Sequence, residues 1–149
     1  VDGLVGSEMC IRDSINPDFD MQISGLATIH LTAVPTFDGG QVFVELQDAQ
    51  TGMRIGHATM DVRYHAGGSD PQTVTPGSAV TMLMEFQAID AIIPAGNGLR
   101  YFLTDTGEDY LAPACGSACV LHVLPSMSTF EAPIIERDGS NTLIVPMYQ

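Results

Sequence analysis

The feature that most constrains this chain is a period of two in its apolar residues, which runs in short blocks from about residue 20 onward. In the block 27–34, apolar side chains at odd positions share one face, and threonine and histidine at even positions share the other. Because successive side chains of a β-strand point to opposite faces, this alternation is typical of a half-buried strand. Clusters of Gly, Pro and Asp separate the blocks at fairly regular intervals, which is the pattern of an all-β sandwich or barrel.

The predicted strands number about eight, and no helical period exceeds two turns. They include residues 27–34, 41–49, 53–65, 80–89, 99–104, 119–124 and 141–148. The inner face of 41–49 is predicted to hold Val42, Val44 and Leu46, and that of 80–89 to hold Val80, Met82, Met84 and Phe86. Two packed sheets are the natural architecture for eight antiparallel strands joined by long crossover loops. The predicted fold class is therefore all-β, a jelly-roll β-sandwich of about eight antiparallel strands.

The first residues of the chain are not expected to be native protein sequence. Residues 3–14 match the in-frame translation of a transposase sequencing adapter, codon by codon from Leu4 to Ser14. The alternative is a short native leader, but these residues contain no apolar h-region and no helical period. We therefore expect residues 1–14 to be an adapter-derived leader and residues 15–149 to form one domain. Since no initiator Met precedes Ile15, we also expect the gene to be truncated upstream, with the active site in the missing part.

The charge of the chain excludes two classes of partner. Its formal net charge is −13, and it contains no lysine. Nucleic-acid backbones and anionic membrane surfaces both require clustered Lys and Arg, so we expect neither nucleic acid nor membrane as a partner. No stretch approaches the roughly 20 apolar residues of a membrane span. The composition thus predicts a soluble domain.

Two cysteines lie outside the expected leader. Cys115 and Cys119 flank Gly and Ser in the segment Ala-Cys-Gly-Ser-Ala-Cys, a loop that can turn tightly enough to bring the two sulfur atoms together. A disulfide and a pair of free thiols both fit the sequence. The disulfide would suit an oxidising compartment, which slightly favours a periplasmic or secreted location over the cytoplasm. Two thiols are too few for a structural zinc site, which needs four ligands.

No catalytic constellation is visible. The Gly-x-Ser-x-Gly elbow of α/β-hydrolases is absent, and Ser69 and Ser117 are interpreted as turn serines. The four histidines are scattered without close pairing, and the acidic run 105–109 lacks the alternating spacing of a calcium loop, so a solvated turn is the favoured interpretation. Nothing in the sequence fixes which acids would face each other as a glycosidase pair. We expect no cofactor or metal and no activity from this chain alone.

Several short motifs occur in a fixed order along the chain. They are Ile23-Ser24-Gly25 leading into Ile29-His30-Leu31, then Val44-Glu45-Leu46-Gln47-Asp48, then residues 56–64, then Thr75-Pro76-Gly77, and finally Ile93-Pro94-Ala95-Gly96 followed by Leu99-Arg100. In this order, from about Met21 to Met147, the chain resembles the C-terminal domain of the X-prolyl dipeptidyl-peptidase superfamily. That superfamily includes cocaine esterase, the α-amino-acid ester hydrolases and the glutaryl cephalosporin acylases. Two departures suggest a divergent subgroup: Asn97-Gly98 stands where the family often has His, and 105–110 replaces a Ser-Ser-x-Phe-Pro-Arg run.

The resemblance implies a galactose-binding-like jelly roll that packs on an α/β-hydrolase domain, whose Ser, Asp and His perform acyl transfer on a small peptide, ester or amide. Such a domain borders the active-site cleft, and it should expose an apolar patch where the catalytic domain docked. Tyr64 and His65 are the candidate cleft-facing residues, because they end a predicted strand in a long loop. The oligomeric state, a homo-oligomer included, is left open.

Two other functions remain open at this stage. Jelly rolls often bind sugars, so the chain could be an independent carbohydrate-binding module. The absence of Trp and the scarcity of Tyr disfavour this interpretation, because such modules display aromatic stacking platforms. The other alternative is a structural interaction sandwich, which the fold alone cannot distinguish from the rest.

Overall fold

A computed structural model describes residues 2–4, 9–11, 18–105, 115, 118–136 and 139–147. The described elements, in chain order, are β1 (Asp2–Leu4), β2 (Met9–Ile11), β3 (Met21–Gly25), β4 (Thr28–Pro35), β5 (Gln41–Asp48), β6 (Arg54–Asp61), the 3-10 helix η1 (Val62–Tyr64), β7 (Val80–Glu85), β8 (Ile89–Ile93), β9 (Leu99–Thr104), β10 (Leu121–Val123), the 3-10 helix η3 (Pro125–Met127), β11 (Thr129–Glu136) and β12 (Gly139–Pro146). None of the helical segments in this part of the chain has the length and apolar character needed to cross a bilayer.

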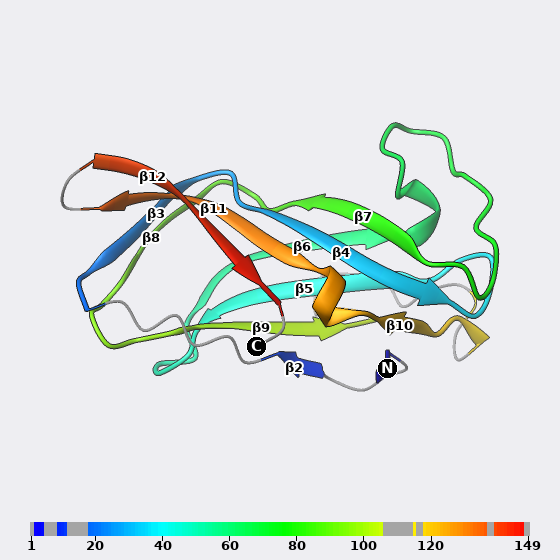
Figure 1. Ribbon diagram of the computed structural model, residues 1–149, viewed down its shortest axis with the longest axis horizontal. Helices are drawn as coiled ribbons and strands as arrows, with labels where there is room; N and C mark the ends of the chain where they lie inside the picture. Colours follow the sequence, from blue (N-terminus) through cyan, green and yellow to red (C-terminus); the bar gives the residue numbers. More distant parts are fainter. Residues whose placement is uncertain are drawn as a thin grey trace.

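Two antiparallel sheets form the sandwich (Figure 1). The eight-stranded sheet runs in the order β1-β10-β4-β11-β3-β8, with β12 paired to β11 and β7 paired to β4. The four-stranded sheet has the order β2-β9-β5-β6. The expected all-β sandwich is confirmed. The two strands within the expected leader, β1 and β2, pair with β10 and β9.

The core lies between the sheets and is built from the side chains that the alternation assigns to the inner faces. The predicted inner-face residues of β4 and β5 are fully buried: Ala27, Ile29, Leu31, Ala33, Val42, Val44 and Leu46. Three aromatic rings form its centre. Phe130 of β11 lies 5.1 Å from Tyr101 of β9 and 5.9 Å, edge to face, from Phe86. Because β9 and β11 belong to different sheets, these rings connect the two layers.

The strand β11 is absent from the strands predicted from the sequence, and a proline lies within it. Proline has no N–H to donate to a ladder, so it normally argues against a central strand. In the structure, β11 pairs with β4 through residues 129–131 and with β3 through residues 134–135, and Pro133 falls between the two partners. Gly25, at φ +131°, ends β3 there, and a Cβ on it would lie 2.9 Å from the Pro133 ring. Pro133 thus lies where the ladder on one side of β11 changes partner, while on the other side it stays in register with Thr142 of β12.

The predicted strand 53–65 is too long. β6 ends at Asp61, whose side chain accepts a hydrogen bond from the Arg63 N–H at 2.9 Å and so caps η1. A short acidic side chain that bonds its own backbone competes with the sheet ladder, and the chain turns into a 3-10 helix instead. The predicted strand 80–89 is also too long, because β7 ends at Glu85 and β8 begins only at Ile89. Between them, Phe86 donates its N–H to the Ala27 carbonyl at 2.9 Å.

Candidate functional site

One end of the sandwich gathers the loops that follow β4 and β6, and we call it the loop end: residues 36–40, residues 61–74, Cys115 and Cys119. The segment after η1 projects from the sandwich in Figure 1. Two hydrogen bonds connect the loops of this end: Val74 donates its N–H to the Asp38 carboxylate at 2.8 Å, and Val62 of η1 donates its N–H to the Gly40 carbonyl at 2.8 Å. Loops positioned by a rigid scaffold are where binding residues concentrate.

Tyr64 and His65, the predicted cleft-facing residues, both lie at this end. Tyr64 is the last residue of η1, and His65 follows it, with its ring Nδ1 2.9 Å from the Val62 carbonyl oxygen. His65 lines a hollow of about 540 Å³ that lies between residues of β6 and β7 and the start of the loop. Met60 and Leu83 give this hollow an apolar wall, and Glu85 gives it an acidic one. Tyr64 is not among its lining residues, so only one of the two candidates lines this hollow.

An ion pair fixes the start of η1. Arg63 donates to Asp61 from Nε at 3.0 Å and from a terminal nitrogen at 2.7 Å. Partial burial opposes the ionisation of Asp61, but the hydrogen bonds and the charge of Arg63 outweigh it and hold the pKa of that carboxyl below its usual value of 3.8. The same contacts raise the pKa of Arg63. The pair therefore stays charged at neutral pH and orients the backbone that leads to Tyr64 and His65.

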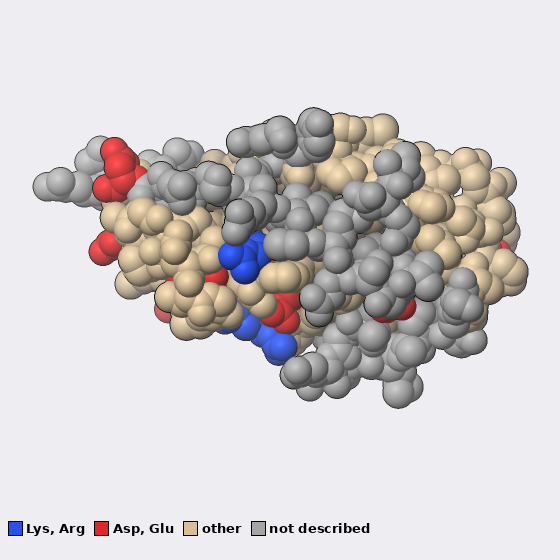
Figure 2. Space-filling view, turned by 90° about the horizontal axis from the view of Figure 1, so that it is seen from below, with Lys and Arg blue, Asp and Glu red and all other residues tan. Residues whose placement is uncertain are grey.

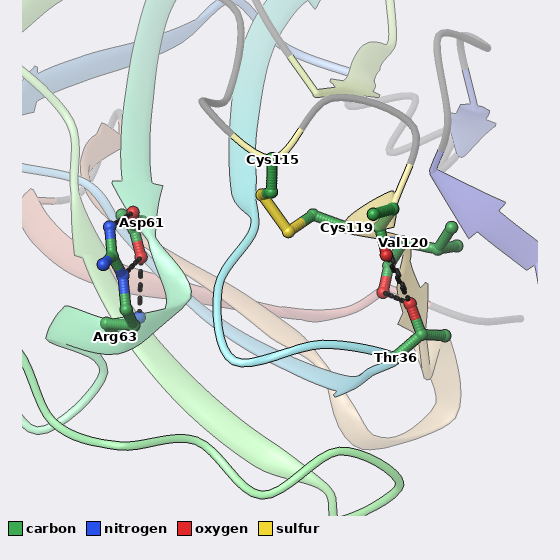
Figure 3. Close-up of a disulfide and its surroundings, with 7 residues drawn as sticks. Thr36, Asp61, Arg63, Cys115, Cys119 and Val120 are labelled. Carbon is green, nitrogen blue, oxygen red and sulfur yellow. Dashed lines mark hydrogen bonds and ion pairs between the residues drawn. A yellow bond between two sulfur atoms is a disulfide. The ribbon is translucent and has the colours of Figure 1, made fainter.

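A disulfide joins Cys115 and Cys119, with Cα atoms 5.7 Å apart (Figure 3). Its sulfur atoms lie against the turn after β4, where a Cβ on Gly39 would lie 3.5 Å from the Cys119 sulfur. Thr36 connects the same turn to the segment after Cys119. It donates its N–H to the Val120 carbonyl at 2.9 Å, and its hydroxyl accepts from the Val120 N–H at 3.1 Å. The disulfide thus lies at the loop end, on the side of the turn away from the Asp61–Arg63 pair in Figure 3.

The other chemically interesting residues do not converge. The histidines lie apart in different contacts: His30 of β4 is 3.9 Å from Glu131, and His57 of β6 stacks on Phe43 at 5.6 Å. His122 lies on β10. Ser69 is exposed in the loop after η1, whereas Ser117 and most of the acidic run 105–109 lie outside the described residues. Over the described ranges, no group of three His, Cys, Asp or Glu residues could hold a metal ion.

At the opposite end of β5 lies a buried carboxylate that the sequence analysis placed only in a family motif. Asp48 is 1% exposed and accepts hydrogen bonds from the Gln50 N–H at 2.8 Å, the Thr51 N–H at 2.9 Å and the Asn97 side-chain amide at 2.8 Å. Burial raises the pKa of Asp48, but these donors outweigh it and hold the pKa below 3.8. Asn97, which stands where the resembled family often has His, therefore joins the β8–β9 turn to the β5–β6 turn.

Comparisons with known proteins agree with this architecture. A family model described as the X-Pro dipeptidyl-peptidase C-terminal non-catalytic domain matches residues 17–104, which is more than half of the chain. A comparison with curated protein sequences finds no match.

Three solved hydrolase structures contain a similar fold. An α-amino acid ester hydrolase matches with a TM-score of 0.64 at 15% identity, covering 85% of this chain and 25% of that one. An aminopeptidase from the marine sediment archaeon Thaumarchaeota archaeon matches with a TM-score of 0.66 at 11% identity, covering 87% and 25%. A CocE/NonD family hydrolase from Staphylococcus aureus matches with a TM-score of 0.57 at 10% identity, covering 89% and 34%. The chain spans about a quarter to a third of the length of these enzymes. On the strength of the family match, the chain belongs to the X-Pro dipeptidyl-peptidase C-terminal non-catalytic domain family.

Proposed function

We propose that this chain is the support domain of a serine hydrolase, that it packs on an α/β-hydrolase domain, and that its loop end forms part of the wall of the substrate cleft. The observation that carries the proposal is the family match over residues 17–104, whose model describes a non-catalytic domain. The scattered histidines support it, since acyl transfer needs a nucleophile and a base within hydrogen-bond reach. The substrate class proposed for the parent enzyme is a small peptide, ester or amide.

The chain alone is expected to be inactive. Purified protein of residues 1–149, incubated with p-nitrophenyl esters and X-Pro p-nitroanilides, should release chromophore no faster than buffer. The complete enzyme, obtained by extending the coding sequence upstream, should hydrolyse at least one of these substrates and should contain a Gly-x-Ser-x-Gly segment in its added part. Turnover by the pure chain that disappears in Ser69→Ala or His65→Ala would refute the support-domain assignment, because it would place the chemistry in this domain.

In the complete enzyme, His65→Ala is expected to raise KM about fivefold and to leave kcat within about twofold, because a cleft-wall contact binds substrate and transition state equally. Tyr64→Ala tests the second candidate residue in the same way. His57→Ala is the matched control, since His57 lies on β6 and stacks on Phe43 outside the hollow. The measurement is the KM and kcat of the three variants by steady-state kinetics, after each variant has been shown to melt like the wild type. Equal KM values for His65→Ala and His57→Ala would contradict the proposal that the loop end borders the cleft.

A further inference from the structure

The outer face of the eight-stranded sheet carries most of the large apolar side chains that the described residues expose. Five of these nine exposed side chains lie on it: Leu26, Leu83, Ile92, Ile135 and Ile144. None of the nine lies on a strand of the four-stranded sheet. Side chains at alternate positions of the same strands are buried in the core, so the exposure is a property of the outward face. Exposed apolar surface gathered on one face marks an interaction site.

The strand register spreads these side chains across the whole face. Ile92 of β8 and Ile135 of β11 both lie opposite Gln22 of β3, so the three side chains form one row across the sheet. Ile144 of β12, which is 62% exposed, lies opposite Glu131 of β11. The apolar residues therefore extend from β8 to β12 and are interrupted by single polar positions.

A hollow of about 220 Å³ lies within this face, where the chain crosses from β3 to β4. Leu26 and Pro133 provide its apolar lining, and Thr28, Thr142 and Glu131 provide polar groups. The Glu131 carboxylate lies 3.9 Å from a His30 ring nitrogen. This combination fits an apolar side chain with a cationic group beside it, because a carboxylate at the rim favours Lys or Arg.

The charged side chains described on this face are acidic. Its outward acidic residues include Glu85, Asp90 and Glu131, and the three arginines of the described residues lie elsewhere, on β6, η1 and β9. On the four-stranded sheet, by contrast, the Arg54 guanidinium lies 2.8 Å from a Glu45 oxygen. Figure 2 shows basic and acidic side chains close together on the face seen from below. A partner surface with Lys and Arg would complement the acidic residues described on this face.

We propose that the outer face of the eight-stranded sheet is the surface on which the catalytic domain docks, and that the partner surface is apolar with Lys and Arg around it. This inference rests on the proposed function. The chain spans 25% to 34% of the similar hydrolases, so in a protein of that size most of the polypeptide lies outside this domain and is available to cover the face. The loop end lies at one edge of the same face, because Leu83 and Glu85 of β7 line the hollow next to His65.

Thiol accessibility tests the docking face. Ile92→Cys and Ile144→Cys, made one at a time in a Cys10→Ser background, are treated with a maleimide in the 149-residue chain and in the complete enzyme. The control is Met53→Cys, because Met53 is 54% exposed, close to the 57% of Ile92, and lies in the β5–β6 turn. Labelling at positions 92 and 144 is expected to slow about tenfold or more in the complete enzyme, as solvent is excluded from an interface core, and labelling at position 53 should change less than about twofold.

Carbene footprinting of the two unmodified proteins gives the same comparison without a substitution and should show protection of β8 and β12. Equal labelling at positions 53, 92 and 144 in a complete enzyme that hydrolyses its substrate would overturn the docking face and leave the proposed function intact. Slow labelling at positions 92 and 144 in the dilute 149-residue chain itself would show that a second copy of the chain covers this face. That result would also overturn the proposal that the catalytic domain docks there. A complete protein without a hydrolase domain would instead overturn the proposed function, and the docking face with it.

Discussion

Phe130→Ala is expected to lower the free energy of unfolding by about 4 kcal/mol, because removing a fully buried phenylalanine loses its transfer free energy and leaves a cavity. Phe130 has no exposed surface and contacts both Tyr101 and Phe86 through its ring. Since Tyr101 belongs to the four-stranded sheet, the cavity would open between the layers. A loss of this size is a large part of the 5–15 kcal/mol typical of a domain.

Urea denaturation followed by far-UV circular dichroism measures the effect, with Phe37→Ala as the control. Phe37 is an aromatic side chain of the same type, but it is 49% exposed in the turn after β4, so its removal should change the free energy of unfolding by less than about 0.5 kcal/mol. If Phe130→Ala and Phe37→Ala lowered the free energy of unfolding by similar small amounts, Phe130 would not connect the two sheets.

Asp48→Ala is expected to cost about 3 kcal/mol of stability. The substitution leaves two backbone N–H groups and the Asn97 amide without the carboxylate that accepts from them in a buried position. Asp90→Ala is the matched control, because Asp90 is exposed and accepts a hydrogen bond only from the Gln22 side chain among the contacts described for it. Its loss should cost less than about 0.5 kcal/mol. Similar losses from the two variants would show that Asp48 does not hold the β5–β6 and β8–β9 turns together.

The pH dependence of stability gives an independent test of the contribution of Asp48 to the free energy of unfolding. The pKa of Asp48 is lowered in the folded chain, so the unfolded state binds the proton first as the pH falls. The stability that Asp48 contributes is therefore present above its unfolded pKa of about 3.8 and is lost as the pH falls through the lower folded value. The difference in unfolding free energy between the wild type and Asp48→Ala should shrink on acidification from about pH 6 to about pH 3. Asp61, whose pKa is also lowered, is present in both proteins and cancels from this difference.

The sequence was sufficient for the parts of the fold that depend on local alternation. The inner faces of β4, β5 and β7 were read correctly, because the pleat sends every second side chain inward and only apolar ones are stable there. The family could also be recognised from the sequence, because several short motifs occur in a fixed order along the chain. Asp48 is one such motif residue, although its partner Asn97 lies 49 positions away and could not be inferred.

Other features required the folded chain. β11 contains Pro133, and only the folded chain shows that the pairing on one side of β11 changes from β4 to β3 at this residue. The alternation predicts a continuing strand after Asp61, whereas in the folded chain the Asp61 side chain caps η1, which ends at Tyr64 and is followed by His65.

What the sequence by itself determined is the class of fold, the inner face of most strands and the family. What only the tertiary structure decided is which residues from distant strands share an outward face. The alternation tells which side of a strand is buried, but not which strands are neighbours, because pairing depends on register and topology rather than on local pattern. Ile92, Ile135 and Ile144 lie in three separate apolar runs of the sequence, and the eight-stranded sheet places them on one surface.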